Sequence, residues 1–303
     1  MPDPSKEGIA HFLMPEELNK LSRLVLLSRY VVEGNLAGAH RSPQKGASTE
    51  FADHRQYIKG DDPKFIDWKV FGRTDRYYIK RYEDETNLRV YLIMDRSNSM
   101  AYGSGDITKY DYACHLAAAL GYVTVKVRDS VGAFLCSDKI DMKFNAMNTM
   151  LHLNNILKRA QHNPPGSTTA LAKNLHMVAE SIGKRALIII LSDLFDDPED
   201  VDLAFAHFRK MNHDVIVFHI LDPKEIDLSF KGNCEFQDME TEETIAIDAR
   251  AMAKDYQEIF QEFLQTHRSA CAAMNIDYRI VKTDESPETF IRAYLEERRR
   301  LSK

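Results

Sequence analysis

The chain has 303 residues, of which 44% are hydrophobic and 28% are charged, with a formal net charge of −6 and a pI near 6.0. A chain of this length can bury a sizeable core as one large domain or two modest ones. The acidic balance argues against a nucleic-acid partner. The N-terminus MPDPSKEGIAHF lacks the basic and apolar regions of a signal peptide, and no apolar run is long enough to span a bilayer, so we expect a cytoplasmic protein without membrane insertion.

The first part of the chain predicts a helix, a long loop and a hairpin. Apolar residues recur at helical spacing from Pro15 to about Gly38, whereas residues 39–76 are polar and turn-rich without a sustained period. The stretch YYIKRYEDETNLRVYLIMD predicts two strands around a DETN turn. We therefore expect residues 1–86 to form an N-terminal segment that packs on the main domain, with the Tyr77 to Tyr82 strand along the edge of its sheet.

The remaining residues, 87–303, alternate between strand and helix patterns. The runs LRVYLIMD, RALIIILSD and DVIVFHILD are apolar almost throughout, which is typical of strands buried on both faces of a parallel sheet. Helical patterns separate or follow them, at about 109–128, 147–161, 169–182, 198–211 and 250–274 and from 287 onward. This rhythm predicts an α/β domain with a doubly wound, mostly parallel sheet.

An acid stands at the end of two of these strands. Asp95 ends LRVYLIMD and Asp193 ends RALIIILSD, and the sequence DRSNS places Ser97 and Ser99 two and four residues after the first acid. In a locally extended loop, residues two apart point to the same side. Because open α/β sheets bind ligands at the carboxyl ends of their strands, we expect these side chains to converge on one point above the sheet.

Two threonines add hydroxyl groups at the predicted entry to a helix. Thr168 or Thr169, in PPGSTTALAKNL, could cap the helix or turn toward the strand ends. Carboxylates and hydroxyls are the hard oxygen donors that Mg²⁺ prefers, and the absence of His and Cys argues against zinc. The pattern predicts a Mg²⁺ site, with Mn²⁺ or Ca²⁺ as alternatives, that keeps one coordination position open for an anion.

The DRSNS stretch resembles the DxSxS motif of von Willebrand factor A-type domains. Thr169 and Asp193 fall where that family has its metal-binding threonine and second aspartate. In that family the five residues form a metal-ion-dependent adhesion site, and a carboxylate of the partner completes the Mg²⁺ shell. The resemblance implies a von Willebrand factor A-like, Rossmann-type fold for residues 87–303, with metal ligands Asp95, Ser97, Ser99, Thr169 and Asp193.

A longer stretch, GAHRSPQKGASTEFADHRQYIKGDDPKFIDWKVFGRTDRYYIKRYEDE, resembles the signature of the bacterial family called domain of unknown function 58. ILDPKEIDL and FQDMETEETIAID resemble it too, so the similarity covers residues from about 30 to 260. Members are similar in being encoded beside MoxR-type AAA+ ATPases, which implies an adaptor role for such an ATPase or its client in protein assembly or maturation. The family's Gly-Gly-Thr-Asp turn is GSTTA here, which leaves open which threonine binds the metal.

Four residues of the stretch RQYIKGDDPKFIDW are candidates for a partner surface, namely Arg55, Asp61, Asp62 and Trp68. The structural interpretation is stronger, because GDDP is favourable turn chemistry and Trp68 is a natural anchor for packing an irregular segment.

The alternative function is a Mg²⁺-dependent phosphohydrolase or phosphotransfer enzyme, since acidic strand ends with Mg²⁺ also describe such sites. Haloacid-dehalogenase-like phosphatases need a second acid two residues after the first, and this chain has Ser97 there. The nearest candidate lysine in sequence is Lys173, on the helix after Thr169. No nucleophile elbow of the form G-x-S-x-G surrounds the serines. We therefore expect a binding module with no catalytic residues rather than an enzyme.

Overall fold

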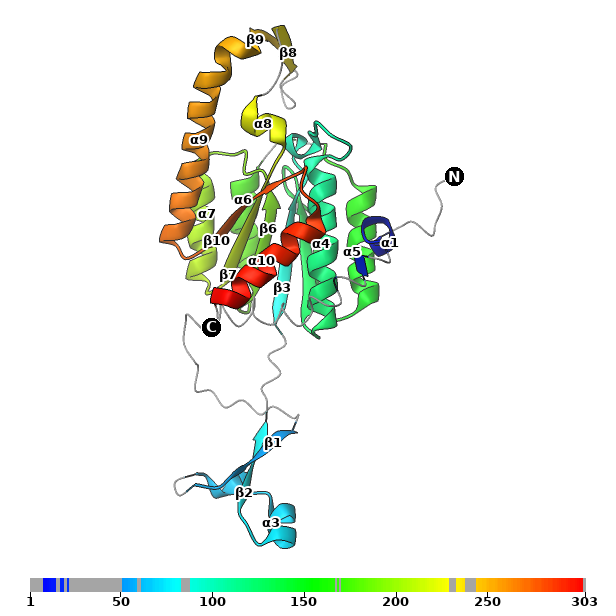
Figure 1. Cartoon of the computed structure of the whole chain (residues 1–303), viewed down its shortest axis with the longest axis vertical. Helices are drawn as coiled ribbons and strands as arrows, with labels where there is room; N and C mark the ends of the chain where they lie inside the picture. The colour runs from blue at the N-terminus through cyan, green and yellow to red at the C-terminus, as the bar shows by residue number, and fades with distance from the viewer. Residues whose placement is uncertain are drawn as a thin grey trace. The chain divides into compact units, whose positions relative to one another are not determined.

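The computed structural model describes residues 8–14, 17–18, 21, 51–58, 61–82, 88–166, 168, 170–228, 233–237 and 244–301. The chain forms two compact units, one of residues 1–39 with 88–303 and one of residues 40–87, which can be followed by colour in Figure 1. The predicted boundary near residue 86 and the predicted packing of residues 1–86 on the α/β domain stay predictions.

The larger unit is built on a six-stranded sheet of order β10-β7-β6-β3-β4-β5. Every neighbouring pair is parallel except β4 with β5, which is antiparallel. This confirms the predicted α/β class with a mostly parallel sheet. The strands are β3 (Arg89–Asp95), β4 (Ser130–Cys136), β5 (Ile140–Met147), β6 (Leu187–Ser192), β7 (Asp214–Leu221) and β10 (Asp277–Lys282).

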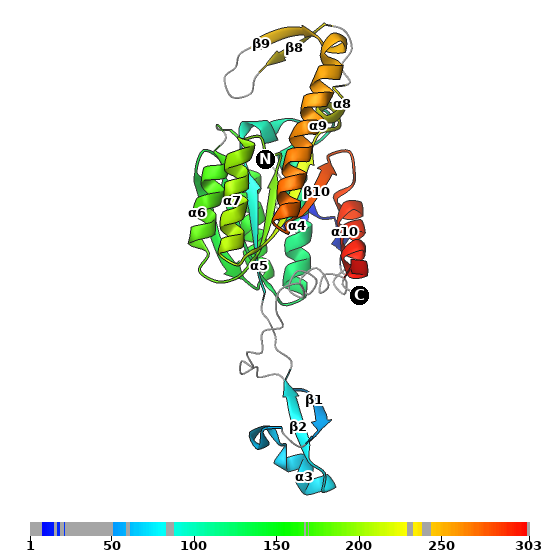
Figure 2. The same ribbon diagram turned by 90° about the vertical axis from the view of Figure 1, so that its left-hand side faces the viewer.

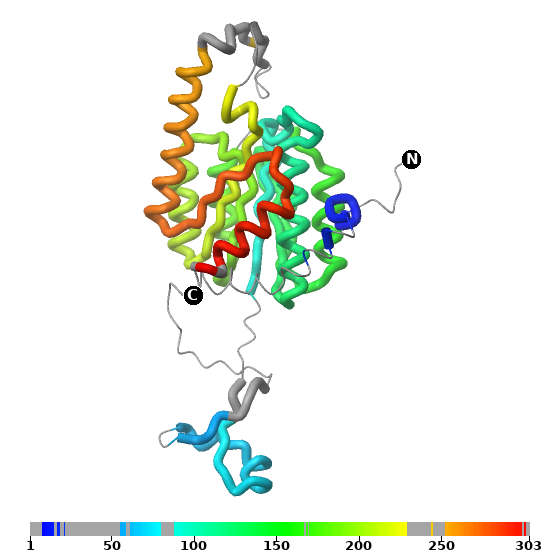
Figure 3. The backbone as a smooth tube through the Cα atoms, in the orientation of Figure 1, coloured from blue at the N-terminus to red at the C-terminus, as the bar shows by residue number. Residues whose placement is uncertain are grey.

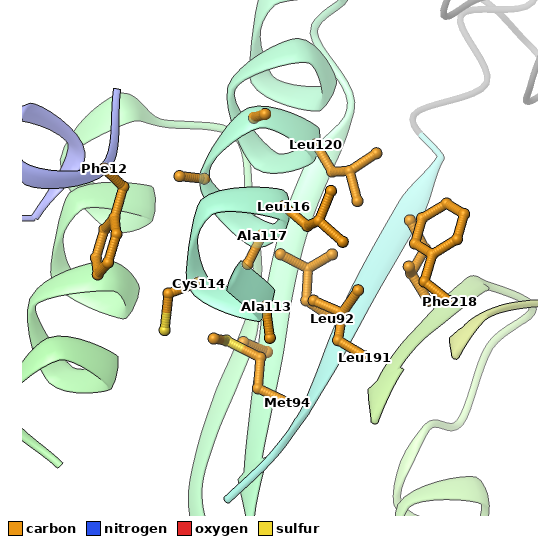
Figure 4. Close-up of a cluster of buried hydrophobic side chains, with 14 of the residues drawn as sticks. Phe12, Leu92, Met94, Ala113, Cys114, Leu116, Ala117, Leu120, Leu191 and Phe218 are labelled. Atoms are coloured by element: carbon orange, nitrogen blue, oxygen red, sulfur yellow. The ribbon is translucent and has the colours of Figure 1, made fainter. Parts of the chain in front are cut away.

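Helices cover both faces of this sheet, as Figure 2 shows edge-on. One face carries α1 (Ile9–Phe12), α4 (Lys109–Lys126), α5 (Met150–His162) and α10 (Pro287–Leu301). The other carries α6 (Leu171–Ser181), α7 (Pro198–Lys210) and α9 (Ala249–Ala273). Because successive side chains of a strand point to opposite faces, Leu92 and Met94 of β3 enter the first core, part of which is drawn in Figure 4, while Tyr91 and Ile93 enter the second.

The connections that follow the parallel strands gather at one edge of the sheet. The 3-10 turn η3 (Asn98–Ala101) follows β3, and α8 (Pro223–Asp227) follows β7. Figure 3 shows both segments at the same end of the sheet. The antiparallel pair β8 (Asn233–Gln237) and β9 (Thr244–Asp248) comes between α8 and α9 along the chain. Connections between parallel strands bring residues far apart in sequence to one edge of the sheet.

The smaller unit corrects two expectations. Strand β2 (Tyr78–Tyr82) pairs antiparallel with β1 (Phe51–Gln56) and makes no hairpin with β3. The hairpin prediction is wrong because β3 lies between β4 and β6, so both of its edges already carry strand partners. The stretch predicted as a long loop also contains η2 (Pro63–Phe65) and α3 (Trp68–Thr74). Most of the predicted N-terminal helix, and the DETN turn itself, lie outside the described residues.

Gly132 of β4 allows a close approach of neighbouring chain segments. A Cβ atom there would lie 2.6 Å from the carbonyl oxygen of Phe144 and 2.6 Å from the ring of Tyr91. Because one obstacle is backbone, we expect Gly132→Ala to lower the free energy of unfolding by about 1–3 kcal/mol in urea denaturation. The control Gly183→Ala, where a Cβ meets nothing within 4 Å, should stay within about 0.5 kcal/mol of wild type. Equal effects of the two substitutions would contradict this packing.

Candidate metal centre at the strand ends

Asp95 is a buried carboxylate at the end of β3. Met94 pairs with Leu191 of β6, so Asp95 lies beside Ser192 at the end of the neighbouring strand. Its Oδ2 accepts a hydrogen bond from Ser192 Oγ at 2.5 Å and its Oδ1 accepts one from the backbone N–H of Ser97 at 2.9 Å. Burial, and then the charge of Asp193, raise the pKa of Asp95 to about 6 against the opposing effect of these hydrogen bonds.

The two serines of the DRSNS stretch meet as predicted. Ser97 Oγ and Ser99 Oγ lie 2.9 Å apart, and the Ser97 side chain is buried. The η3 turn that follows Ser97 contains Met100, which is fully buried in the same core cluster as Met94 of β3. The motif is therefore anchored in the core by its methionine neighbours, and its two serine hydroxyls lie together.

Asp193 follows β6 and is also fully buried. The next residue, Leu194, adopts the left-handed conformation with φ of 54°, and its N–H donates to Ser192 Oγ at 2.9 Å. This turn brings the N–H of Phe195 within 3.4 Å of Asp193 Oδ1. Non-glycine residues in this region cost free energy and persist where surrounding contacts hold them, as they do here.

Thr169 lies outside the described residues, and Thr168 is exposed. The segment before them is tied to the serine motif by Arg96, whose side chain donates to the carbonyl oxygens of Asn163 at 2.7 Å and Pro164 at 2.8 Å. Arg96 is the residue between Asp95 and the first serine, and no sequence pattern indicated a role for it.

The segment after Thr169 is tied to the loop that carries Asp193. Asp196 Oδ2 accepts a hydrogen bond from the backbone N–H of Ala172, in the first turn of α6, at 3.0 Å. Described residues on both sides of Thr169 are thus bonded to the two loops that supply the other candidate ligands.

The structure adds charged groups that the sequence analysis missed. The ammonium of Lys109 lies 2.7 Å from Asp193 Oδ2 and 2.5 Å from Glu225 Oε1. Lys173, the lysine considered from the sequence, is instead exposed. Lys109 precedes Asp193 by 84 residues, so no local pattern signals this contact. Glu225 belongs to the ILDPKEIDL stretch, which was noted only as part of a family signature.

A third buried acid ends β7, the neighbour of β6. Asp222 accepts hydrogen bonds from the backbone N–H of Ser104 at 2.8 Å, from the N–H of Lys224 at 2.9 Å and from Thr283 Oγ1 at 3.3 Å. Burial would raise the pKa of Asp222, but these hydrogen bonds outweigh burial and hold the pKa below its ordinary value. The ending ILD repeats the acid-terminated pattern of the other two strands, which is a signal that could have identified it.

The candidate partner-binding residues all lie in the 40–87 unit. Arg55 forms an ion pair with Asp61 at 2.7 Å, and Asp62 caps η2. The Trp68 side chain is 61% exposed, so its expected role as a packing anchor is wrong within the described part of the unit. Ile66 is buried instead, where it bridges to Ile79 of β2.

The donor chemistry of the strand ends fits Mg²⁺. Among the described residues no group of three or more His, Cys, Asp or Glu side chains is placed to bind a metal. The candidate set instead combines the two carboxylates of Asp95 and Asp193 with the hydroxyls of Ser97 and Ser99. Such hard oxygens suit a partly hydrated Mg²⁺. A divalent cation would also relieve the repulsion by Asp193 that raises the pKa of Asp95.

Together these features define a mixed α/β protein with a buried acidic, hydroxyl-lined centre where its parallel strands end. The chain belongs to the family described as protein of unknown function DUF58, whose model matches residues 53–269. Uncharacterized proteins of Mycobacterium tuberculosis and Mycobacterium bovis are similar to it, at 24% identity over 230 residues that cover 75% of this chain and 72% of theirs.

The chain is also similar to solved structures of proteins from two Bacteroides species. BatB, a conserved hypothetical protein from Bacteroides thetaiotaomicron, is 14% identical over 70% of this chain and 99% of its own, with a TM-score of 0.43. An aerotolerance-related membrane protein from Bacteroides fragilis is 16% identical over 69% of this chain and 99% of its own, with a TM-score of 0.46.

The expected cytoplasmic location is contradicted by the descriptions of the structural neighbours. The Bacteroides fragilis neighbour is described as a membrane protein, and a third neighbour, from Vibrio fischeri, as a membrane-spanning protein, at 16% identity over 68% of this chain and 96% of its own with a TM-score of 0.24. Within the described residues, no helix has the length and apolar character needed to cross a bilayer.

The raised pKa of Asp95 predicts a specific pH dependence. Asp95 ionises near 3.8 when unaffected by its surroundings and near 6 in the fold, so between these values the native state binds more protons than the unfolded state. Stability therefore falls as pH rises from about 4 to about 6. In metal-free protein at pH 7, we expect Asp95→Asn, which keeps the shape and loses the charge, to raise the free energy of unfolding by about 1–3 kcal/mol.

Urea denaturation in chelator at pH 4 and pH 7 measures this effect. The control Asp106→Asn changes the same charge on an exposed loop after β3 and should leave the free energy of unfolding within about 0.5 kcal/mol of wild type. An Asp95→Asn protein that is less stable than wild type at pH 7 would contradict the assignment.

Proposed function

We propose that this protein is a non-enzymatic binding module that uses a von Willebrand factor A-like, metal-ion-dependent adhesion site to recruit an acidic group of a protein partner. The residues that would hold the metal, Mg²⁺ or alternatively Mn²⁺ or Ca²⁺, are Asp95, Ser97, Ser99, Thr169 and Asp193. A bound ion would supply a positive charge with a coordination position free for an incoming carboxylate.

The observation that carries the proposal is the hydrogen-bonded arrangement of Asp95 and the two serines. One strand end and the loop after it place a carboxylate beside a hydroxyl pair with a 2.9 Å separation, and Ser192 fixes the carboxylate from the neighbouring strand. The bonds of Arg96 to Asn163 and of Asp196 to Ala172 tie residues on both sides of Thr169 to the centre and support Thr169 as the further ligand.

The charge around the centre narrows the chemistry of the partner. Several exposed acids lie on loops at the carboxyl edge of the sheet, namely Asp106, Asp138, Asp197, Asp284 and Glu285. They outnumber Lys139 and Lys282, the exposed basic residues of these same loops. A carboxylate carried by an acidic surface would be repelled, so the partner's acid should sit within a basic surface. A MoxR-type AAA+ ATPase or its client, with this protein as adaptor in assembly or maturation, is the partner that we propose.

The enzymatic alternative has less support. A phosphatase of the kind considered from the sequence would use an acid at position 97 and a lysine that reaches the phosphoryl group. Position 97 is a serine, and Lys109, which contacts Asp193, has no exposed side-chain surface and is paired with two carboxylates.

The test is binding of a purified MoxR-type ATPase from the same organism, measured by biolayer interferometry in excess Mg²⁺ and in chelator. We expect binding in Mg²⁺ and at least about tenfold weaker binding in chelator or with Asp95→Asn. The matched control Glu180→Gln, an exposed acid at the C-terminal end of α6, should bind like wild type. Equal binding in Mg²⁺ and chelator, or unchanged binding by Asp95→Asn, would contradict the proposal that the contact depends on a metal ion.

A further inference from the structure

Lys109 occupies an unusual position for a lysine. It is the first residue of α4, and its side chain has no exposed surface. A positive charge at a helix N-terminus opposes the helix dipole, and burial of an unpaired ammonium is costly. Burial therefore lowers the pKa of Lys109, but the charges of Asp193 and Glu225 outweigh burial and hold the pKa above its ordinary value. The two carboxylates thus keep this lysine charged inside the protein.

The contact with Asp193 orients the candidate ligand. The Lys109 ammonium donates to Asp193 Oδ2. Asp193 Oδ1 accepts only a long 3.4 Å hydrogen bond from the N–H of Phe195. The rings of Tyr102 and Phe195 lie 5.8 and 5.5 Å from the ammonium. These neighbours keep the ammonium beside the carboxylate, so Oδ1 is the oxygen left for the centre.

The contact with Glu225 fixes the other side of the ammonium. Glu225 Oε2 accepts from the backbone N–H of Asp222 in the capping box of α8, and its carbonyl oxygen accepts from Tyr256 Oη of α9 at 2.7 Å. Burial raises the pKa of Glu225, while the charge of Lys109 opposes the rise. The ammonium is therefore shared between one acid of the metal centre and one acid of a structural helix.

We propose that Lys109 is a positioning residue that neutralises Asp193 and makes metal binding depend on the partner's carboxylate. The inference rests on the proposed function. With Lys109 in place, a metal ion meets one uncompensated carboxylate, Asp95, and the repulsion of a nearby ammonium. The carboxylate of the partner then supplies the missing negative charge, so the metal ion and the partner bind together rather than one after the other.

Isothermal titration with Mg²⁺ alone tests this charge balance. Lys109→Met should bind Mg²⁺ at least about tenfold more tightly than wild type, because it removes the competing cation. Glu225→Gln should bind Mg²⁺ more weakly than wild type, because Asp193 is then the only carboxylate that neutralises the Lys109 ammonium within this ion pair. Lys109→Arg, which keeps the charge, should stay near wild type. Lys126→Met, at the far end of α4, makes the same charge change away from the centre and should also match wild type.

Lys109→Met leaves two buried carboxylates and can fail to fold, so the double variant Lys109→Met/Glu225→Gln is compared with Glu225→Gln alone. We expect the double variant to bind Mg²⁺ at least about tenfold more tightly than Glu225→Gln. Thermal unfolding in chelator provides a readout that needs no metal and confirms that each variant is folded.

The possible results separate the two proposals. Unchanged or weaker Mg²⁺ affinity after loss of Lys109, with wild-type binding that Asp95→Asn abolishes, overturns the inference and leaves the proposed function standing. Tight Mg²⁺ binding by Lys109→Met, together with weak or undetectable Mg²⁺ binding by the wild-type protein in the absence of a partner, supports the inference. Absence of Mg²⁺ binding in every folded variant overturns both.

Discussion

The arrangement of the whole centre depends on one electrostatic constraint, the burial of two carboxylates at the ends of adjacent parallel strands. Asp95 and Asp193 are both nearly inaccessible to solvent, and each must be compensated where it lies. Asp193 is compensated by the ammonium of Lys109, and Asp95 by hydrogen bonds from Ser192 and the Ser97 N–H. Asp95 has no cation among these contacts, and burial, followed by the charge of Asp193, raises its pKa to about 6.

This constraint is costly in a protein that needed only a stable core. A buried ion pair is often no more stabilising than apolar residues of the same volume, and an incompletely compensated acid is worse. Buried carboxylates that are kept despite this free-energy cost are typical of a functional site. It also fits the position of the centre, since the sheet below is packed on both faces while its carboxyl edge carries polar loops.

The parts of the fold that follow from local pattern were predictable. The apolar runs that became β3, β6 and β7 lie within one or two residues of their predicted bounds, because strands buried on both faces leave a continuous hydrophobic signal. Asp95 and Asp193 were identifiable because each stands at the end of such a run. Their i, i+2, i+4 spacing from Asp95 indicated Ser97 and Ser99 as further candidates.

The parts that depend on contacts between distant segments were not predictable. Lys109 is separated from Glu225 by 116 residues, and nothing near either residue indicates their pairing. The pairing of β2 with β1 rather than with β3 likewise depends on which strands β3 already has beside it. Trp68 shows the limit of arguing from residue type, since a large aromatic side chain was expected inside and lies mostly exposed.

The most direct test of the central claim is a crystal structure of the protein grown or soaked with Mn²⁺, whose anomalous scattering locates the ion independently of the surrounding chain. The account predicts an anomalous peak within about 2–3 Å of oxygens of Asp95, Ser97 and Ser99. A fully occupied peak elsewhere, or no peak at the strand ends with Mn²⁺ in excess and a carboxylate such as acetate present, would contradict it.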